Sequence, residues 1–493
     1  MEQNRVYTGD CKVLRFFEEL SAIPRGSGNE KAASDFIVRF AEARNCTAIQ
    51  DERYNVIVKK PASPGYEDAP VVIFQGHLDM VCEKNKSTAH DFTKDPIRFK
   101  LDGDMIYAQD TTLGADNGIG VSFAMALIDA GEELAHPALE LLLTTEEETS
   151  MGGAEHLDAS QLSGQLLINF DSDREGVLFV SSAGGASAFH TVPIVWAEGG
   201  TGASAAVAAY TLAVQGLKGG HSGDDIIHER GNANKLLGRA LDDLRRQTAF
   251  ELASISGGMK PNAIPREAEA VIGLSEEGAR IAEARVAELN RIFRDEFEVT
   301  DPGVEVVLSA AAGDAAPVER WFAEETKLAV IRLLALIPSG VMSMSKEIEN
   351  LVRTSTNIGT VTMRESEIVF ESLVRSSHRS QLDVVLQQLA TLGEAVGVPF
   401  RHDHYFPGWP YRSESKAREV FAQVYERKYG KPLEVKAIHA GLECGIFIEK
   451  MPHLDAVSYG PNMYNFHTPE EHVSISSVER TWEFLQDVMR ELK

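Results

Sequence analysis

The chain of 493 residues is 43% hydrophobic and carries 74 acidic against 48 basic residues, a formal net charge of −26. This length and apolar content suffice for a large core and favour at least two domains, whereas the acidic excess argues against a nucleic-acid partner. No apolar stretch reaches the roughly 18 residues that a membrane helix needs, and the first residues lack the pattern of a signal peptide. The four cysteines show no C-x-x-C spacing and fit a reducing compartment. We therefore expect a cytoplasmic protein with no membrane association.

The first 185 or so residues alternate between helical and strand patterns, which predicts an α/β layered fold. Ser27 and Glu30 are spaced as a capping box before a predicted helix over residues 31–43. The pattern further predicts strands near residues 53–59, 69–75, 138–143 and 165–169, and a helix over 117–130. In an open sheet of this kind, ligands collect beyond the carboxyl ends of the strands.

From about residue 187 the pattern becomes β-rich, with long amphipathic helices predicted over residues 232–246, 276–297, 318–336 and 381–395. This spacing indicates an α+β insertion. Asn262 precedes an alternating strand over 267–274, and Asn357 similarly precedes one over 367–374. We read this echo as two α+β lobes within the insertion.

After about residue 401 the pattern predicts a helix over 416–429, a strand over 433–438 and a final helix over 477–492. His467 lies in this tail, whereas the other candidate metal ligands precede residue 172, so the tail must fold back onto the first segment. Residues 1–186 and 400–493 are therefore expected to form one discontinuous catalytic domain. Residues 187–399 would form an inserted lid domain.

Ligand-type side chains follow several predicted strands and loops. They are two histidines and a group of carboxylates: His77, Asp79, Asp116, Glu146, Glu147, Asp171 and His467. Histidine and carboxylate ligands of this kind are typical of a two-zinc hydrolase.

Residue type and spacing suggest a role for each of these groups. His77 and Asp79 point the same way in an extended strand, so Asp79 can orient the imidazole. Asp116, in a Gly-flanked loop before a helix, can bridge two metals roughly 3.5–4 Å apart. Side chains of Glu146 and Glu147 diverge at a strand end, so one can bind metal while the other holds the water.

Alternatives remain open for several of these positions. Asp173 could replace Asp171, and Glu148 could replace one of its neighbours. His439, Glu443 and Cys444 form another potential ligand group, although enough ligands exist without them. His221 lies between glycines, which favours a substrate-facing loop.

The motifs around His77, Asp116, Glu146, Asp171, His221 and His467 together resemble those of the M20 metallopeptidases. The segments Ser21-Ala-Ile-Pro-Arg-Gly-Ser-Gly-Asn-Glu30 and His439-Ala-Gly-Leu-Glu-Cys-Gly445 most resemble the aminoacyl-histidine (Xaa-His) dipeptidases, or bacterial carnosinases, within that family. The resemblance covers essentially the whole chain. It implies a zinc-peptidase catalytic domain, a mixed sheet between helices, with an inserted lid.

The resemblance also implies specific roles for the site residues. His77 and Asp171 would bind one zinc, Glu147 and His467 the other, with Asp116 bridging, Asp79 orienting and Glu146 as general base. His221 would hold the oxyanion and Arg375 the substrate carboxylate, although Arg353 has a similar setting. Further candidates for substrate contact are Asn262, Gly441 and Glu443. A cis peptide bond is implied between Asp116 and Asn117.

The expected function is that of a cytosolic di-zinc dipeptidase, with Mn²⁺ or Co²⁺ as alternative metals. Its substrates would be Xaa-His and related dipeptides, β-alanyl-histidine included, and the enzyme is expected to be a homodimer. Glu146 would take a proton from the attacking water and return it to the leaving amine. The alternatives are an M20 deacylase or tripeptidase, or a peptide-binding homologue that has lost catalysis.

Overall fold

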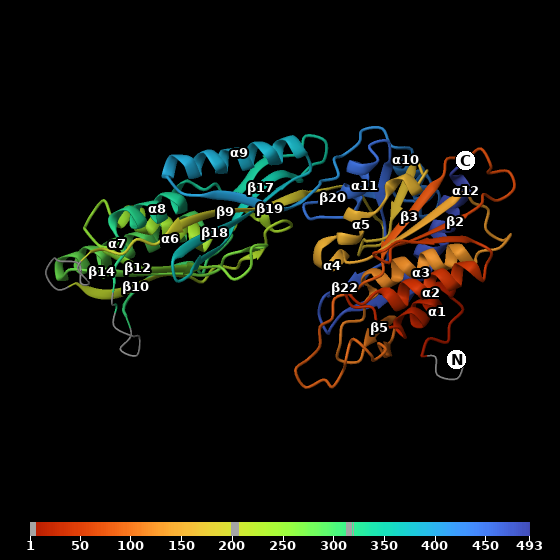
Figure 1. Cartoon of the computed structure of the whole chain (residues 1–493), viewed down its shortest axis with the longest axis horizontal. Helices are drawn as coiled ribbons and strands as arrows, with labels where there is room; N and C mark the ends of the chain where they lie inside the picture. The colour runs from red at the N-terminus through yellow and green to blue at the C-terminus, as the bar shows by residue number, and fades with distance from the viewer. Residues whose placement is uncertain (1–5, 199–206, 312–317, 319) are drawn as a thin grey trace. The chain divides into compact units, whose positions relative to one another are not determined.

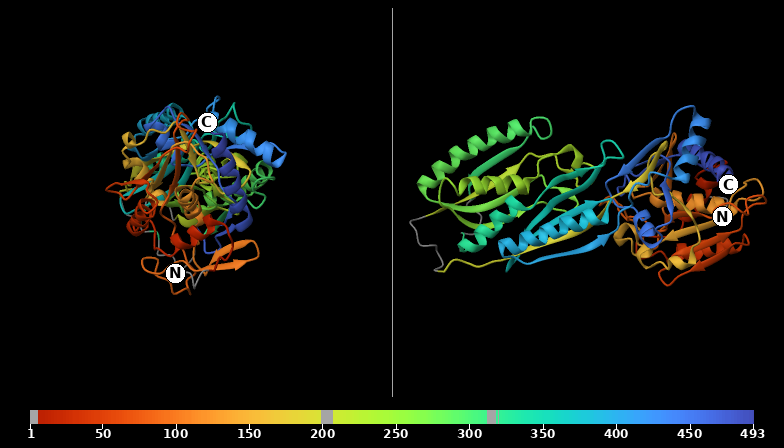
Figure 2. Two further views of the ribbon diagram at one scale, coloured as in Figure 1. Left: turned by 90° about the vertical axis from the view of Figure 1, so that its right-hand side faces the viewer. Right: turned by 90° about the horizontal axis from the view of Figure 1, so that it is seen from above.

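The structure is a computed structural model that describes residues 6–198, 207–311, 318 and 320–493. The chain divides into two compact units, whose helices and strands are labelled in Figure 1. Unit 1 comprises residues up to Ser182 together with Trp409–Ala437 and Leu442–Lys493, and unit 2 comprises Ala183–Gly408 and Ile438–Gly441. Both ends of the described chain belong to unit 1 (Figure 2).

Unit 1 is built on an eight-stranded mixed sheet. In sheet order its strands are β1 (Thr47–Gln50), β2 (Val56–Lys60), β6 (Leu139–Thr144), β3 (Val72–His77), β7 (Leu166–Asn169), β21 (Asp455–Ser458), β8 (Val177–Ser182) and β20 (Glu434–Ile438). The four central strands β6, β3, β7 and β21 run parallel. Their carboxyl ends therefore meet at one edge of the sheet, where the candidate ligands follow them.

The central strands consist of nearly continuous buried residues, as expected for a parallel sheet covered on both faces. Helix α3 (Ala115–Asp129) packs on β3 and contacts α1 (Lys12–Ser21) and α2 (Lys31–Glu42). The remaining helices of unit 1 are α4 (Glu147–Ser150), α5 (Gly152–His156), η2 (Ala159–Gln161), α10 (Lys416–Tyr429), α11 (Cys444–Lys450) and α12 (Ile475–Glu491). A second sheet has the order β22 (Met463–Tyr464), β23 (His472–Ser474), β5 (Met105–Ala108) and β4 (Phe99–Asp102).

Unit 2 is built on one nine-stranded, antiparallel sheet. Its order is β15 (Glu305–Ala310), β10 (Ala208–Gln215), β14 (Ala268–Leu274), β12 (Glu251–Gly257), β17 (Val352–Met363), β18 (Glu367–Ser376), β9 (Gly184–Pro193) and β19 (Phe400–Phe406), with β16 (Gly340–Met344) paired to β17. Short strands β11 (Gly220–His221) and β13 (Ala263–Ile264) pair separately. Because β12 pairs with β17, the two expected lobes share one continuous sheet.

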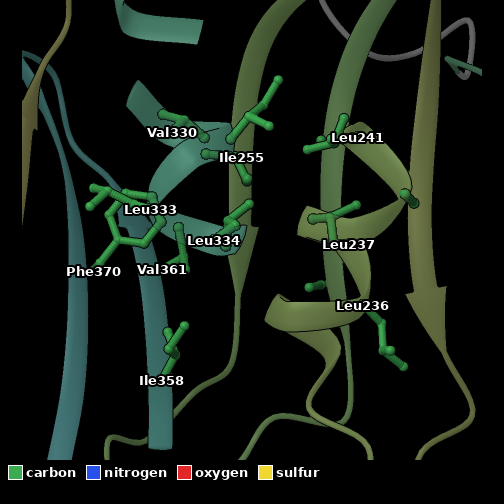
Figure 3. Close-up of a cluster of buried hydrophobic side chains, with 14 of the residues drawn as sticks. Leu236, Leu237, Leu241, Ile255, Val330, Leu333, Leu334, Ile358, Val361 and Phe370 are labelled. Carbon is green, nitrogen blue, oxygen red and sulfur yellow. The ribbon is translucent and has the colours of Figure 1, made fainter. Parts of the chain in front are cut away.

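The helices of unit 2 form a chain of neighbours, α7–α6–α8–α9, that packs against this sheet. Their bounds are α7 (Glu276–Glu296), α6 (Ala233–Leu244), α8 (Glu324–Leu336) and α9 (Arg379–Val396), and η3 (Ile226–His228) lies apart from them. Leucines of α6 and α8, among them Leu237 and Leu334, face strand residues such as Ile255 and Phe370 in one buried cluster (Figure 3). The apolar stripe that predicted these helices is thus the surface that covers the sheet.

The α/β and α+β composition confirms the predicted fold class, and most predicted helices are present. Helix α8 starts at Glu324, later than predicted, and Glu319 of the predicted range lies outside the described residues. The capping box was wrong: the N-cap of α2 is Glu30, and the Ser27 hydroxyl donates to Asp79 at 2.8 Å. The Glu30 carboxylate instead accepts the amides of Gly28 and Glu146.

Candidate metal centre and substrate-binding residues

The carboxyl-terminal edge of the unit 1 sheet brings together the predicted histidines and carboxylates. His77 ends β3, and Asp116 lies at the start of α3, where the predicted cis bond to Asn117 is present. Asp171 follows β7, and His467 lies in the segment between β22 and β23. Four separate parts of the chain therefore supply one cluster.

Asp116 lies between the two histidines. Its Oδ1 is 3.1 Å from His77 Nε2, and its Oδ2 is 3.3 Å from His467 Nε2. Asp171 Oδ1 is 3.8 Å from His77 Nε2, so Asp171 lies beside His77. Asp173 forms no ion pair with either histidine within the described residues, and its backbone carbonyl accepts the amide of Met463 at the start of β22. The geometry thus favours Asp171 over Asp173 as the cluster carboxylate.

The three consecutive glutamates differ from the arrangement expected from sequence. Glu148 Oε2 lies 3.0 Å from His467 Nε2, whereas Glu147 Oε2 lies 4.0 Å from His77 Nε2. Glu146 pairs with Arg53 at 3.2 Å, and its side chain is 33% exposed against 6% for Glu148. The carboxylate beside His467 is therefore that of Glu148, and the Glu146 carboxylate pairs with Arg53 instead.

The backbone explains this difference. Strand β6 ends at Thr144, and Glu146 adopts the left-handed conformation with φ 56°, which turns the chain into the short helix α4. Glu147 and Glu148 are consequently in the first turn of a helix, so the alternation of a strand does not apply to them. Sequence analysis noted Glu148 as an alternative, but a left-handed non-glycine residue leaves no clear signal in a sequence.

Asp79 does more than orient an imidazole. Its Oδ1 lies 3.3 Å from His77 Nδ1, and that nitrogen also lies 3.2 Å from the Asp79 carbonyl. Its two carboxylate oxygens accept the amides of Glu147 and Glu148, each at 3.1 Å. Asp79 therefore connects the His77 loop to the glutamate segment.

The carboxylates of the cluster are largely shielded from solvent and lie close together, whereas His467 is exposed, and the pKa values reflect this setting. Burial raises the pKa of Asp116, but hydrogen bonds to His467 and His77 outweigh it and hold the pKa below its usual range. Burial and the charge of Asp116 raise the pKa of Asp171 to about 6. Hydrogen bonds to Asp116 and Glu148 raise the pKa of His467 to about 10. Burial, with the charge of Asp171, raises the pKa of Glu147 well above its usual value.

The donor set suits two divalent cations. His77, Asp116 and Glu148 each offer a ligand atom, and these atoms lie within 4.8 Å of one another. Asp116 presents one oxygen to each histidine, as a carboxylate that bridges two ions must. Imidazole and carboxylate donors are those of zinc sites of the hydrolytic type. Several buried carboxylates at this spacing repel one another, and cations between them would relieve that repulsion.

Glu443 lies in the buried layer behind the cluster. Its Oε2 accepts hydrogen bonds from Thr144 Oγ1 at 2.8 Å and Gln75 Nε2 at 2.5 Å, and burial raises its pKa to about 8. Cys444 is a buried thiol whose pKa burial also raises well above its usual value. Glu443 was predicted to contact substrate, but its side chain is only 1% exposed and two buried side chains hold it. This arrangement supports a structural role.

Within unit 2, His221 and Arg375 lie in one polar cluster with Asp224 and His439. His221 Nδ1 is 3.5 Å from Asp224 Oδ2, and the charge of Asp224 partly offsets the burial that lowers the pKa of Arg375 to about 10. His439 Nε2 lies 2.8 Å from Ser355 Oγ. Burial, then the charge of Arg375, lowers the pKa of His439 to about 3, so this imidazole is neutral at physiological pH.

The structure distinguishes the two candidate arginines. Arg353 forms a salt bridge with Glu347 at 3.0 Å. Arg375 is 5% exposed and forms no salt bridge within the described residues, although the Nε of either arginine is buried without a hydrogen-bond partner. A buried guanidinium with free donors is the better candidate for an added carboxylate.

Asn262 and Gly441 lie in segments adjacent to this cluster. His221 pairs with Ala263, next to Asn262, and the Asn262 carbonyl accepts the amide of Ser222 at 2.9 Å. Gly441 closes the segment Ile438–Gly441, which carries His439. Gly223 approaches the His439 carbonyl so closely that an added Cβ would lie 2.3 Å from it.

Two buried residues of unit 1, Arg25 and Glu471, received no role from sequence, although Arg25 lies within a segment quoted above and Glu471 is four residues after His467. Glu471 accepts backbone amides of the loop before Asp116, and Arg25 donates to the carbonyl of Gly114 in that loop and to the carbonyl of Leu78 after β3. Both are buried, and this could not be recognised from sequence, because charged residues in loops are usually exposed to solvent.

Comparisons with known proteins agree with this geometry. The model of the peptidase family M20/M25/M40 matches residues 73–491. The chain is 36% identical over 476 residues to the cytosol non-specific dipeptidase of Escherichia coli (strain K12), covering 97% of this chain and 96% of that protein.

Solved structures show the same fold. The aminoacylhistidine dipeptidase of Vibrio alginolyticus aligns with a TM-score of 0.90 and 35% identity, covering 100% of this chain and 99% of that one. A tripeptidase of Staphylococcus aureus aligns with a TM-score of 0.56 at 12% identity, covering 98% of each chain, which shows the fold alone. None of the described helices is long and apolar enough to cross a membrane. The chain belongs to the peptidase family M20/M25/M40.

Proposed function

We propose that this chain is a cytoplasmic metallodipeptidase that hydrolyses Xaa-His and related dipeptides. The observation that carries the proposal is Asp116 held between His77 and His467 at 3.1 and 3.3 Å, at the ligand-binding edge of the sheet. Family membership and the two dipeptidases that are at least 35% identical over nearly the whole chain support the reaction class.

We assign the metal ligands from the geometry. His77 and Asp171 would hold one ion, His467 and Glu148 the other, with Asp116 between them. Glu148 thus takes the ligand role that the family resemblance implied for Glu147. Zn²⁺ suits this donor set best, with Mn²⁺ or Co²⁺ as alternatives. When bound, the two ions would polarise the scissile carbonyl and ease deprotonation of the attacking water.

Glu147 is the better general base. Its side chain is only 12% exposed and lies at the cluster without being the carboxylate paired with His467, and its raised pKa suits a group that takes up and returns a proton. The carboxylate of Glu146 forms a salt bridge with Arg53. Glu147 would receive a proton from water as the peptide bond is attacked and deliver it to the leaving amine.

Unit 2 would supply the substrate contacts. Arg375 offers free guanidinium donors for the dipeptide carboxylate, and His221 is the candidate donor to the developing oxyanion. Asn262 and Gly441 lie in segments adjacent to the cluster of His221 and Arg375, and they remain candidates for further contacts with substrate.

The test is a substrate panel with the purified protein reconstituted with Zn²⁺, Mn²⁺ or Co²⁺. Hydrolysis of free dipeptides, with little activity on acylated amino acids or tripeptides, supports the proposal. A preference for acylated amino acids or tripeptides would identify a deacylase or tripeptidase instead. Bound metal without any hydrolysis would identify a peptide-binding homologue. Light scattering at working concentration tests the expected homodimer.

A further inference from the structure

Two buried side chains of opposite charge hold the loop that carries Asp116. Glu471 accepts four consecutive amides, those of Leu113 (2.7 Å), Gly114 (2.9 Å), Ala115 (2.7 Å) and Asp116 (3.3 Å). Its side chain is 2% exposed. A carboxylate at this position satisfies amides at the start of a helix, which have no partner within the helix itself.

The Arg25 guanidinium binds a backbone carbonyl of the same loop. Its Nη2 donates to the carbonyl of Gly114 at 2.5 Å, and its Nη1 donates to the carbonyls of Leu78 at 3.0 Å and Asp79 at 3.1 Å. The guanidinium therefore spans from the loop of Asp116 to the loop that follows His77. The planar fork of arginine suits this geometry, which lysine cannot reproduce.

The surrounding residues leave room for this guanidinium. An added Cβ on Gly114 or on Gly118 would lie 2.6 or 2.5 Å from Arg25 Nη2. Among the described residues Arg25 forms no salt bridge within 4 Å, and the charges of Glu471 and Asp79 partly offset the burial that lowers its pKa to about 10. A buried cation without a direct ion pair is costly, so its position at this junction points to a specific role.

We infer that Arg25 and Glu471 are positioning residues that fix the spacing between His77 and Asp116, and with it the geometry of the metal centre. The inference rests on the metal ligation proposed above. Neither residue touches a metal or substrate in this scheme, since each acts through the backbone of the ligand-bearing loops. Residues that orient metal ligands typically affect metal affinity and turnover more than substrate affinity.

The experiment compares Arg25→Lys and Glu471→Gln with the exposed controls Arg39→Lys and Glu470→Gln. Glu471→Gln keeps the shape of the side chain but presents an NH₂ group to amides that need an acceptor. We expect both test variants to weaken Zn²⁺ or Co²⁺ affinity by roughly 10- to 100-fold and to change the visible absorption spectrum of the Co²⁺-loaded protein. The kcat should fall while KM for a dipeptide changes little, and the controls should match the wild type.

A readout that does not depend on metal separates this inference from the proposed function. Hydrogen exchange of the amides of residues 113–116, measured with chelator present, should speed up by about tenfold in Glu471→Gln, the factor expected for loss of hydrogen bonds of this kind. Wild-type exchange and wild-type metal affinity in both test variants would overturn the positioning role. If the wild type binds no metal and hydrolyses no dipeptide, the proposed function fails. The hydrogen-exchange result still shows whether Glu471 holds the loop of residues 113–116.

Discussion

Asp116 is the residue on which both halves of the candidate metal centre depend. Each of its oxygens faces a different histidine, so its loss removes a ligand from both positions. We expect Asp116→Ala to lose both metals and His467→Ala to lose chiefly one, as measured by elemental analysis after gel filtration. Two tightly retained metals in Asp116→Ala would contradict the bridging role.

The glutamates at 146, 147 and 148 are expected to give three distinct phenotypes. Glu147→Gln should lower kcat by about 10²- to 10⁴-fold, the usual contribution of general base catalysis, with metal content retained. Glu148→Gln should lose metal from the His467 side. Glu146→Gln serves as the matched neighbour and should stay close to wild type in both measurements. Loss of turnover with full metal content in Glu146→Gln would instead restore the assignment made from sequence.

This segment also shows how far the sequence could predict the site. His77 and Asp171 follow predicted strands and Asp116 precedes a predicted helix, and the parallel sheet brings such positions to one edge. His467 was placed near them only by the argument that the tail folds back, and it lies between β22 and β23. Which of the three glutamates lies beside His467 could not be predicted, because it depends on the left-handed backbone of Glu146 and on the amides that Asp79 binds. Long-range partners of this kind leave no periodic pattern.

At the level of secondary structure, helix α8 depends on a lysine from another helix. Lys235 of α6 donates to the carbonyls of Leu334 at 2.6 Å, Ala335 at 2.8 Å and Ile337 at 2.7 Å, and burial lowers its pKa to about 8. These carbonyls end α8 and have no partner within the helix. The single ammonium group therefore joins two helices of the layer that covers the sheet.

Replacing this lysine should weaken unit 2 specifically. Lys235→Met keeps the aliphatic stem but leaves three carbonyls without their donor, which should cost about 1–3 kcal/mol of stability and lower Tm by about 2–12 °C. Metal content should not change, because the cluster lies in unit 1. Lys346→Met, on an exposed lysine of unit 2, is the control. Equal Tm values for the two variants, measured by calorimetry, would show that the capping contacts contribute little.

The helices and strands of unit 2 could be predicted from sequence, but their assembly into one sheet could not. The apolar stripes of α6 and α8 follow from sequence periodicity, and their leucines cover the sheet as expected. The pairing of β12 with β17, which turns two lobes into one sheet, involves Gly257 and Val361, about a hundred residues apart. Local patterns do not encode such a pairing.

Arg375 tests the division of roles across the whole molecule, with metal ligands in unit 1 and substrate contacts in unit 2. Arg375→Ala should raise KM for dipeptides by about 10- to 100-fold, as expected for a lost charge-assisted contact of roughly 1.5–3 kcal/mol. Substrates with an amidated carboxyl group should hardly respond, and Arg353→Ala, which breaks only the pair with Glu347, is the matched control. A KM effect in Arg353→Ala alone would transfer the role to that arginine.

The two units have separate sheets and separate cores, so the response to metal should also divide between them. The buried acidic cluster belongs entirely to unit 1, and a ligand stabilises the folded unit that binds it by RT ln(1 + [L]/Kd), about 4 kcal/mol at a thousandfold excess over Kd. Calorimetry should therefore resolve two transitions, of which only one shifts to higher temperature with Zn²⁺ and to lower temperature with chelator. Lys235→Met should shift only the other. A single transition that moves as a whole under both changes would mean that the two units unfold cooperatively, and the metal effect could then not be assigned to unit 1 alone.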